Sequence, residues 1–188
     1  GRGALSETTT GASNTAVGIN ALILNTTASD NTAVGANALQ ANTTGTQNVA
    51  VGSFASNTNS TGTGNTVVGY AAMFVNATGA QNTAVGRNAL NNNTVSNNTA
   101  VGYEALNANT TGASNTAVGK GAATSNTTAS NNTAVGFESL TANTTGSSNT
   151  AIGKSAMAAN TTGQNNVGIG RLTLDANNTG DSNVAIGA

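Results

Sequence analysis

The sequence predicts an all-β fold, a parallel β-solenoid (β-roll) of eleven turns with about 17 residues in each turn. Three observations predict it: a repeat of nearly constant length that runs through the chain, a composition that disfavours helices, and the absence of the turn signals that antiparallel hairpins use. We expect residues 1–188 to form a single repeat domain.

The repeat begins with an asparagine that Thr-Ala-Val-Gly follows in most copies. With that asparagine as position 1, the consensus is N-T-A-V-G-x-x-A-L-x-x-N-T-T-G-x-S, in which position 4 is always Val or Ile and position 5 is always Gly. The copies begin at Asn14, Asn31, Asn48, Asn65, Asn82, Asn98, Asn115, Asn132, Asn149, Asn166 and Asn183. One copy is a residue short, between Asn93 and Asn98, and a deletion tolerated there indicates a surface turn.

The residue types favour strands over helices. A period of 17 is too short for two packed helices, and Asn, Thr, Gly and Val are weak helix formers. We therefore expect two short strands per turn, one over positions 2–4 and one over positions 8–13, with the invariant glycine at a tight corner between them. An antiparallel meander would use Asn-Gly or Asp-Gly turns, and the sequence contains neither dipeptide.

Parallel turns place each residue about 4.8 Å from its equivalent in the next turn. Identical side chains then form ladders, and asparagine amides can hydrogen-bond along such a ladder. Like charges would repel there, which accounts for a charged fraction of only 6%. The charges are expected to be scattered, and position 6, which varies freely, is expected to face solvent without forming a coherent patch.

A single coil of this kind has a thin core. We expect the outer Ala and Leu side chains of positions 8 and 9 to need cover, so that several chains associate side by side. The chain begins and ends at nearly the same phase of the repeat, without a polar capping repeat, and this favours end-to-end stacking as well.

The repeat also resembles a known family. The motif Asn-Thr-Ala-Val-Gly followed by Ala-Leu, as in residues 31–39 and 82–90, is similar to the head repeats of trimeric autotransporter adhesins, and to repeats of phage tail fibres and large secreted bacterial surface proteins. The resemblance covers essentially the whole chain. It implies a left-handed β-roll, three chains around an axis, and an extracellular or cell-surface location.

The residues offer little for catalysis. The chain has no His and no Cys, and its carboxylates, Glu7, Asp30, Glu104, Glu138, Asp175 and Asp181, form no close pair in the sequence. We therefore predict that the protein is not an enzyme and has no cofactor or metal. A net charge of −1 also disfavours nucleic acid as a partner, and no apolar segment is long enough for insertion into a membrane.

The segment Asn-Thr-Thr at positions 12–14 matches the acceptor pattern for N-glycosylation in nearly every turn. The candidate acceptors are Asn25, Asn42, Asn59, Asn76, Asn109, Asn126, Asn143, Asn160 and Asn177. An alternative interpretation, which we favour, is an asparagine ladder beside a threonine ladder. A third hypothesis is an ice-binding array, although that arrangement needs two Thr columns flanking one inward residue, and the threonines at positions 13 and 14 are adjacent.

These observations together predict a structural or adhesive segment of an extracellular fibre that associates with copies of itself. Its further ligand would be a component of a host surface or matrix. The alternatives are the shaft of a phage or injection-machine tail fibre and an ice-binding solenoid.

Overall fold

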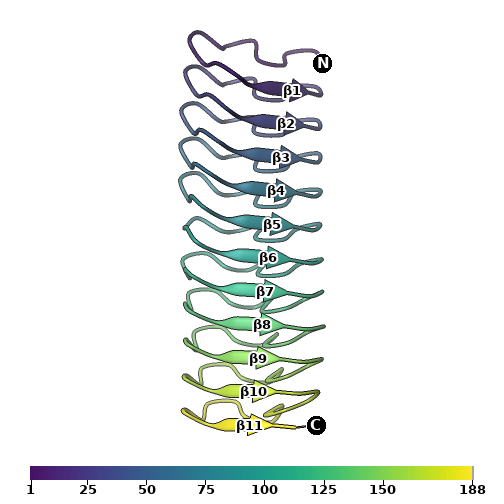
Figure 1. Ribbon diagram of the computed structural model, residues 1–188, viewed down its shortest axis with the longest axis vertical. Helices are drawn as coiled ribbons and strands as arrows, with labels where there is room; N and C mark the ends of the chain where they lie inside the picture. Colours follow the sequence, from purple (N-terminus) through teal and green to yellow (C-terminus); the bar gives the residue numbers. More distant parts are fainter. Residues whose placement is uncertain (188) are drawn as a thin grey trace.

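A computed structural model describes residues 1–187 as a solenoid in which the chain repeats the same path once per turn (Figure 1). Each repeat contributes one strand, and the eleven strands form a single sheet in chain order. The strands are β1 (Thr15–Val17), β2 (Thr32–Val34), β3 (Val49–Val51), β4 (Thr66–Val68), β5 (Thr83–Val85), β6 (Thr99–Val101), β7 (Thr116–Val118), β8 (Thr133–Val135), β9 (Thr150–Ile152), β10 (Val167–Ile169) and β11 (Val184–Ile186). No helix occurs in residues 1–187. The predicted all-β parallel solenoid is confirmed.

The register of the sheet places each repeat position beside its equivalent in the next turn. Thr15 pairs with Thr32 and Val17 pairs with Val34, and the same parallel register continues to β11. From β2 to β10 the central residue of each strand is buried, whereas the residues on either side are partly or fully exposed. This alternation is the ordinary period of a strand, so position 3 faces the core and positions 2 and 4 face outward.

The second predicted strand, over positions 8–13, is absent, and this part of the prediction was wrong. The chain makes a series of turns there instead, with φ of 57° at Asn37 and 49° at Leu39. A strand would place neighbouring residues on opposite faces. The left-handed residues allow two neighbours, Ala38 and Leu39, to point inward together, and both are fully buried. Backbone hydrogen bonds still join this wall to the next turn, as from Leu39 N to Ala55 O at 3.1 Å.

Left-handed conformations recur at fixed places in the repeat. Every non-glycine residue with positive φ in residues 1–187 lies at position 7, 9 or 17. Such a residue costs roughly 1–2 kcal/mol relative to the right-handed conformation. Position 17 carries mostly Ser, Asn, Asp or Gln, several of which tolerate the left-handed region, but position 9 carries mostly Leu and Met. Burial of those large apolar side chains offsets the backbone cost, because each contributes about 1.5–3 kcal/mol.

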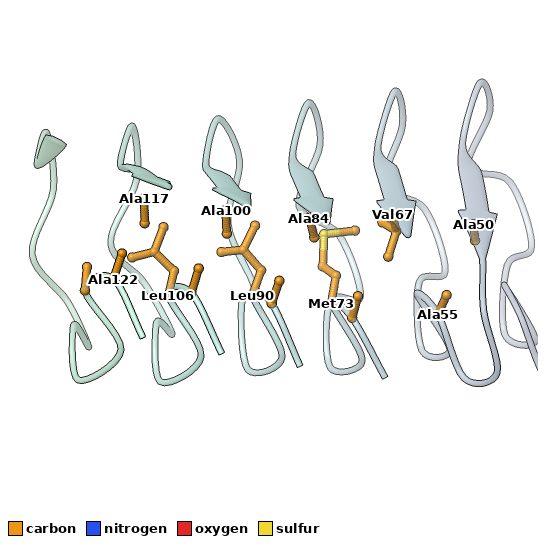
Figure 2. Close-up of a cluster of buried hydrophobic side chains, with 14 of the residues drawn as sticks. Ala50, Ala55, Val67, Met73, Ala84, Leu90, Ala100, Leu106, Ala117 and Ala122 are labelled. Carbon is orange, nitrogen blue, oxygen red and sulfur yellow. The ribbon is translucent and has the colours of Figure 1, made fainter. Parts of the chain in front are cut away.

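The core is a narrow column of small and medium apolar side chains (Figure 2). Position 3 supplies alanine from most strands, and positions 8 and 9 supply mostly Ala and Leu or Met from the opposite wall. Figure 2 shows Leu90 pointing toward Ala100 and Leu106 toward Ala117, each in the next strand. Positions 8 and 9 are therefore buried within one chain. The expectation that they need a neighbouring chain for cover was wrong, because it assumed that they belong to a strand.

One turn departs from this core pattern. Ser56 occupies position 9, where the other turns have Leu, Met or Ala. Its side chain is 1% exposed and its hydroxyl has no hydrogen-bond partner. The next strand carries Val67 where most strands have alanine, so its additional methyl groups lie where a longer side chain from position 9 would reach.

Replacing Ser56 with alanine is expected to raise the free energy of unfolding by about 1 kcal/mol, because a buried hydroxyl without a partner opposes folding. Both residues carry one Cβ, so the φ of 50° is equally strained before and after the change. Urea denaturation followed by circular dichroism measures the difference. Ser53→Ala is the control, since the partly exposed Ser53 hydroxyl donates to Ala36 O at 3.4 Å. A gain no larger for Ser56→Ala than for this control would contradict the prediction.

The short repeat keeps the sheet in register, since Thr83 of β5 still pairs with Thr99 of β6. The missing residue is at position 14. Asn93 Nδ2 donates to the carbonyl of Val95, two residues further on, whereas the corresponding acceptor in other turns lies three residues further on. Thr94, beside the deletion, is exposed. The predicted surface turn is confirmed. The row of side-chain hydrogen bonds is interrupted at this place, where Asn76 Oδ1 in the preceding turn has no partner, and it is interrupted again at Asn160 Oδ1, beside turns of full length.

Candidate functional site

The candidate glycosylation sites form a ladder inside the coil. Those at Asn25, Asn42, Asn59, Asn76, Asn109, Asn126, Asn143 and Asn160 are fully buried, and Asn177 is partly buried. Asn42 Nδ2 donates to Asn25 Oδ1 at 3.1 Å and to Gly45 O at 2.9 Å, and most turns repeat this pair of bonds. Glycosylation of the buried side chains is not compatible with the folded coil, because a glycan is attached through that inward-facing Nδ2. The asparagine ladder is the interpretation that the structure supports.

A second asparagine ladder runs along position 1, at the start of each strand. Asn31 Oδ1 accepts a hydrogen bond from Asn48 N at 2.9 Å, and Asn31 Nδ2 donates to Gly45 O at 2.9 Å. Gly45 O therefore receives one bond from each ladder. The two ladders satisfy the inner polar groups of the loop over positions 12–17, and their work is structural.

The most regular exposed surface is the outer sheet face, by which we mean the side chains of positions 2 and 4. Position 2 is Thr or Val. Position 4 is a column of branched apolar residues: Val17, Val34, Val51, Val68, Val85, Val101, Val118, Val135, Ile152, Ile169 and Ile186. Each of these eleven is at least partly exposed, and in the middle of the column Val68 and Val118 are both 37% exposed. Equivalent side chains recur at the strand spacing of about 4.8 Å, and the two columns stand roughly 7 Å apart.

Sequence reasoning did not single out this face. The threonines it considered were those of positions 13 and 14, but the structure uses the position-13 hydroxyls within the coil: Thr26 Oγ1 donates to Thr43 O at 3.3 Å and Thr43 Oγ1 to Ser60 O at 3.1 Å. The signal for the outer face was the alternation within Thr-Ala-Val, where one small residue separates two larger ones.

The basic residues form a second exposed feature, which we call the position-6 column. All five Lys and Arg residues of the chain occupy position 6: Arg2, Arg87, Lys120, Lys154 and Arg171. Tyr70, Tyr103 and Phe137 occupy the same position in the turns between them. These eight side chains are exposed at the corner that follows each strand. The expectation that position 6 forms no coherent patch was wrong, because cations and aromatic rings of neighbouring turns contact one another along this column. The expectation of scattered charges holds for the carboxylates and was wrong for the cations.

Carboxylates are not gathered in the same way. Residues 1–187 contain no group of three or more acidic side chains placed to hold a metal ion, and no pocket was found in this part of the chain. None of the described segments is a helix long and apolar enough to cross a bilayer. The candidate functional surfaces are therefore the outer sheet face and the position-6 column.

No family model, curated protein or solved structure matches the chain.

Proposed function

We propose that this chain is a structural and adhesive segment of an extracellular or cell-surface fibre, in which copies associate side by side through the outer sheet face. The observation that supports the proposal is the unbroken column of Val and Ile at position 4, which a single chain leaves partly exposed along the length of its sheet. Contiguous apolar surface of this kind is characteristic of interaction sites.

A second copy of the same chain is the occupant that fits this face over its whole length. Its Val and Thr columns have the same spacing, so that ridges of one sheet can enter the grooves of the other, as in face-to-face sheets about 10 Å apart. A globular partner would match the repeat over only a few turns. The resemblance of the repeats implies three copies around a common axis, and we include that number and the left-handed coil in the proposal. A tail fibre shaft would use the same assembly and is the alternative within this class.

The test compares the mass in solution of the natural chain with that of Val101→Lys/Val118→Lys/Val135→Lys, by sedimentation velocity over a range of concentrations. We expect the natural chain to form species heavier than 18.1 kDa and the variant to remain at that mass, because three ammonium groups cannot be buried unpaired between sheets. The matched control is Thr111→Lys/Thr128→Lys/Thr145→Lys, which changes exposed position-14 residues in the same three turns. A natural chain that is monomeric at every concentration, or a control that dissociates equally, would reject the proposal.

A second candidate function is supported by the same face. In most strands a Thr and a Val or Ile flank one inward residue, which is close to the arrangement that the ice-binding hypothesis requires, although one of the two columns is apolar. Thermal hysteresis by a monomeric chain, lost in the triple Val→Lys variant, would support ice binding in place of assembly.

A further inference from the structure

We propose that the position-6 column binds an extended acidic polysaccharide. The inference goes beyond assembly and does not use the outer sheet face. It rests on the order of the side chains in the column, their mutual contacts and their spacing along the coil.

Cations and aromatic rings alternate through most of the column. From the turn of β4 to that of β9, position 6 reads Tyr70, Arg87, Tyr103, Lys120, Phe137 and Lys154. The Arg87 guanidinium carbon lies 5.7 Å from the centre of the Tyr70 ring and 5.9 Å from that of Tyr103. Lys120 Nζ and Lys154 Nζ lie 5.3 and 5.8 Å from the centre of the Phe137 ring. Such contacts hold long side chains in place at an exposed site, which reduces the entropy lost when a ligand binds.

The contacts also decide what the column presents to solvent. Cations from the turns on either side lie over the Phe137 ring, so this ring offers its rim to a ligand more readily than its face. The rim of an aromatic ring is its positive part. The column therefore presents cation, positive rim and cation in succession, a surface suited to the oxygens of an anionic chain. Nucleobases, which bind aromatic side chains by stacking on an open face, fit it poorly.

The neighbouring carboxylates follow the same alternation. Glu104 and Glu138 stand at position 7 beside the aromatic residues Tyr103 and Phe137, whereas the turn of Lys120 has glycine at that position. Glu104, through a hydrogen bond and its negative charge, raises the pKa of the Tyr103 phenol. The two carboxylates also keep the local positive charge low, which disfavours a densely charged polyphosphate.

The spacing of the cations indicates how often the ligand carries charge. Arg87, Lys120 and Lys154 are two turns apart, a separation of roughly 10 Å along the coil. One sugar of an extended polysaccharide is comparable in length to one strand spacing. A chain with a carboxylate on every second sugar would therefore place successive carboxylates beside successive cations and its neutral sugars beside the aromatic rims.

The probe is hyaluronan, in which an acidic sugar alternates with a neutral one, and the ligand control is carboxyl-reduced hyaluronan, which keeps the backbone without the charge. Binding to the natural chain is measured by isothermal titration calorimetry at low and at physiological salt. We expect binding to hyaluronan that weakens with salt, and none to the reduced polymer. Lys120→Gln/Lys154→Gln should lower the affinity about tenfold, since surface ion pairs contribute modestly one by one.

The matched control variant is Thr111→Asp/Thr145→Asp, which shifts the net charge by the same amount at exposed residues of the loop that precedes the strand. It should bind nearly as tightly as the natural chain, and the melting temperatures of both variants show whether the coil is intact. Equal loss in both variants would overturn the proposal, because binding would then depend on net charge alone. Absence of hyaluronan binding, or tighter binding of single-stranded DNA, would also overturn it. The sedimentation mass of Lys120→Gln/Lys154→Gln should equal that of the natural chain, because the column shares no residue with the outer sheet face, and this separates failure of this inference from failure of assembly.

Discussion

Replacing Gly86 with alanine is expected to lower the free energy of unfolding by at least about 3 kcal/mol. Gly86 has φ of 136°, which side-chain-bearing residues rarely adopt, and it occupies the corner after β5. A Cβ added there would lie 2.6 Å from Gly102 C in the next turn and closer still to Gly102 O. Because that atom is backbone, the clash can be relieved only by separating the turns. This close approach explains why position 5 is always glycine.

Gly64→Asn is the matched control for this prediction. Gly64 has φ of 65°, and the nearest atom to an added Cβ is Gln81 Cγ at 3.9 Å. Asn97 and Asn131 occupy the same position in other turns with φ of 67° and 61°. The change should therefore alter stability by less than about 1 kcal/mol. Urea denaturation of both variants provides the comparison, and similar losses at Gly86 and Gly64 would refute the explanation.

Replacing Asn109 with leucine is expected to lower the free energy of unfolding by about 3–5 kcal/mol, although the two side chains are similar in size. Asn109 Nδ2 donates to Asn93 Oδ1 and to Gly112 O, both at 2.8 Å, and Asn109 Oδ1 accepts from Asn126 Nδ2 at 2.9 Å. Leucine would leave these buried partners with fewer hydrogen bonds or none, and each buried polar group without a hydrogen-bond partner lowers the stability by about 1–3 kcal/mol.

Asn76→Leu tests the ladder more finely, because Asn76 makes only the two donor bonds and its Oδ1 already lacks a partner. Asn76→Leu should lower the free energy of unfolding less than Asn109→Leu does. Thr111→Leu, at an exposed residue, should leave the free energy of unfolding almost unchanged. Urea denaturation of the three variants under the same conditions provides the comparison. The reverse order for Asn109 and Asn76, or a large loss at Thr111, would contradict a hydrogen-bonded ladder.

Much of the fold was predictable because the repeat determines how successive turns stack. The constant period, the invariant Gly and the absence of hairpin dipeptides together predict parallel turns, one Thr-Ala-Val strand in each, and asparagine ladders. The wall over positions 8–13 was not predictable from residue preferences, because Leu39 and its equivalents adopt a left-handed backbone that their own propensity disfavours. Burial in the core, a property of the closed coil, decides their conformation.

The candidate surfaces, too, were predictable from the sequence only in part. The basic residues could have been assigned to position 6 by counting from each repeat, since they are all in phase. Their contacts with Tyr70, Tyr103 and Phe137 depend on rotamers and on the stacking distance, which a sequence pattern does not contain. The exposure of the outer sheet face likewise follows only once it is known that the position-3 side chain points into the core.

The interruptions of the asparagine ladder have a mechanical consequence. In a solenoid each turn is held only by its neighbours, so a tensile load along the coil is carried in series by every interface between turns. Two interfaces lack a rung of the asparagine ladder, because Asn76 Oδ1 between the turns of β4 and β5 and Asn160 Oδ1 between the turns of β9 and β10 accept no hydrogen bond, whereas most other interfaces keep theirs. The sheet is continuous across both interfaces, and we expect extension of the coil to begin at one of them.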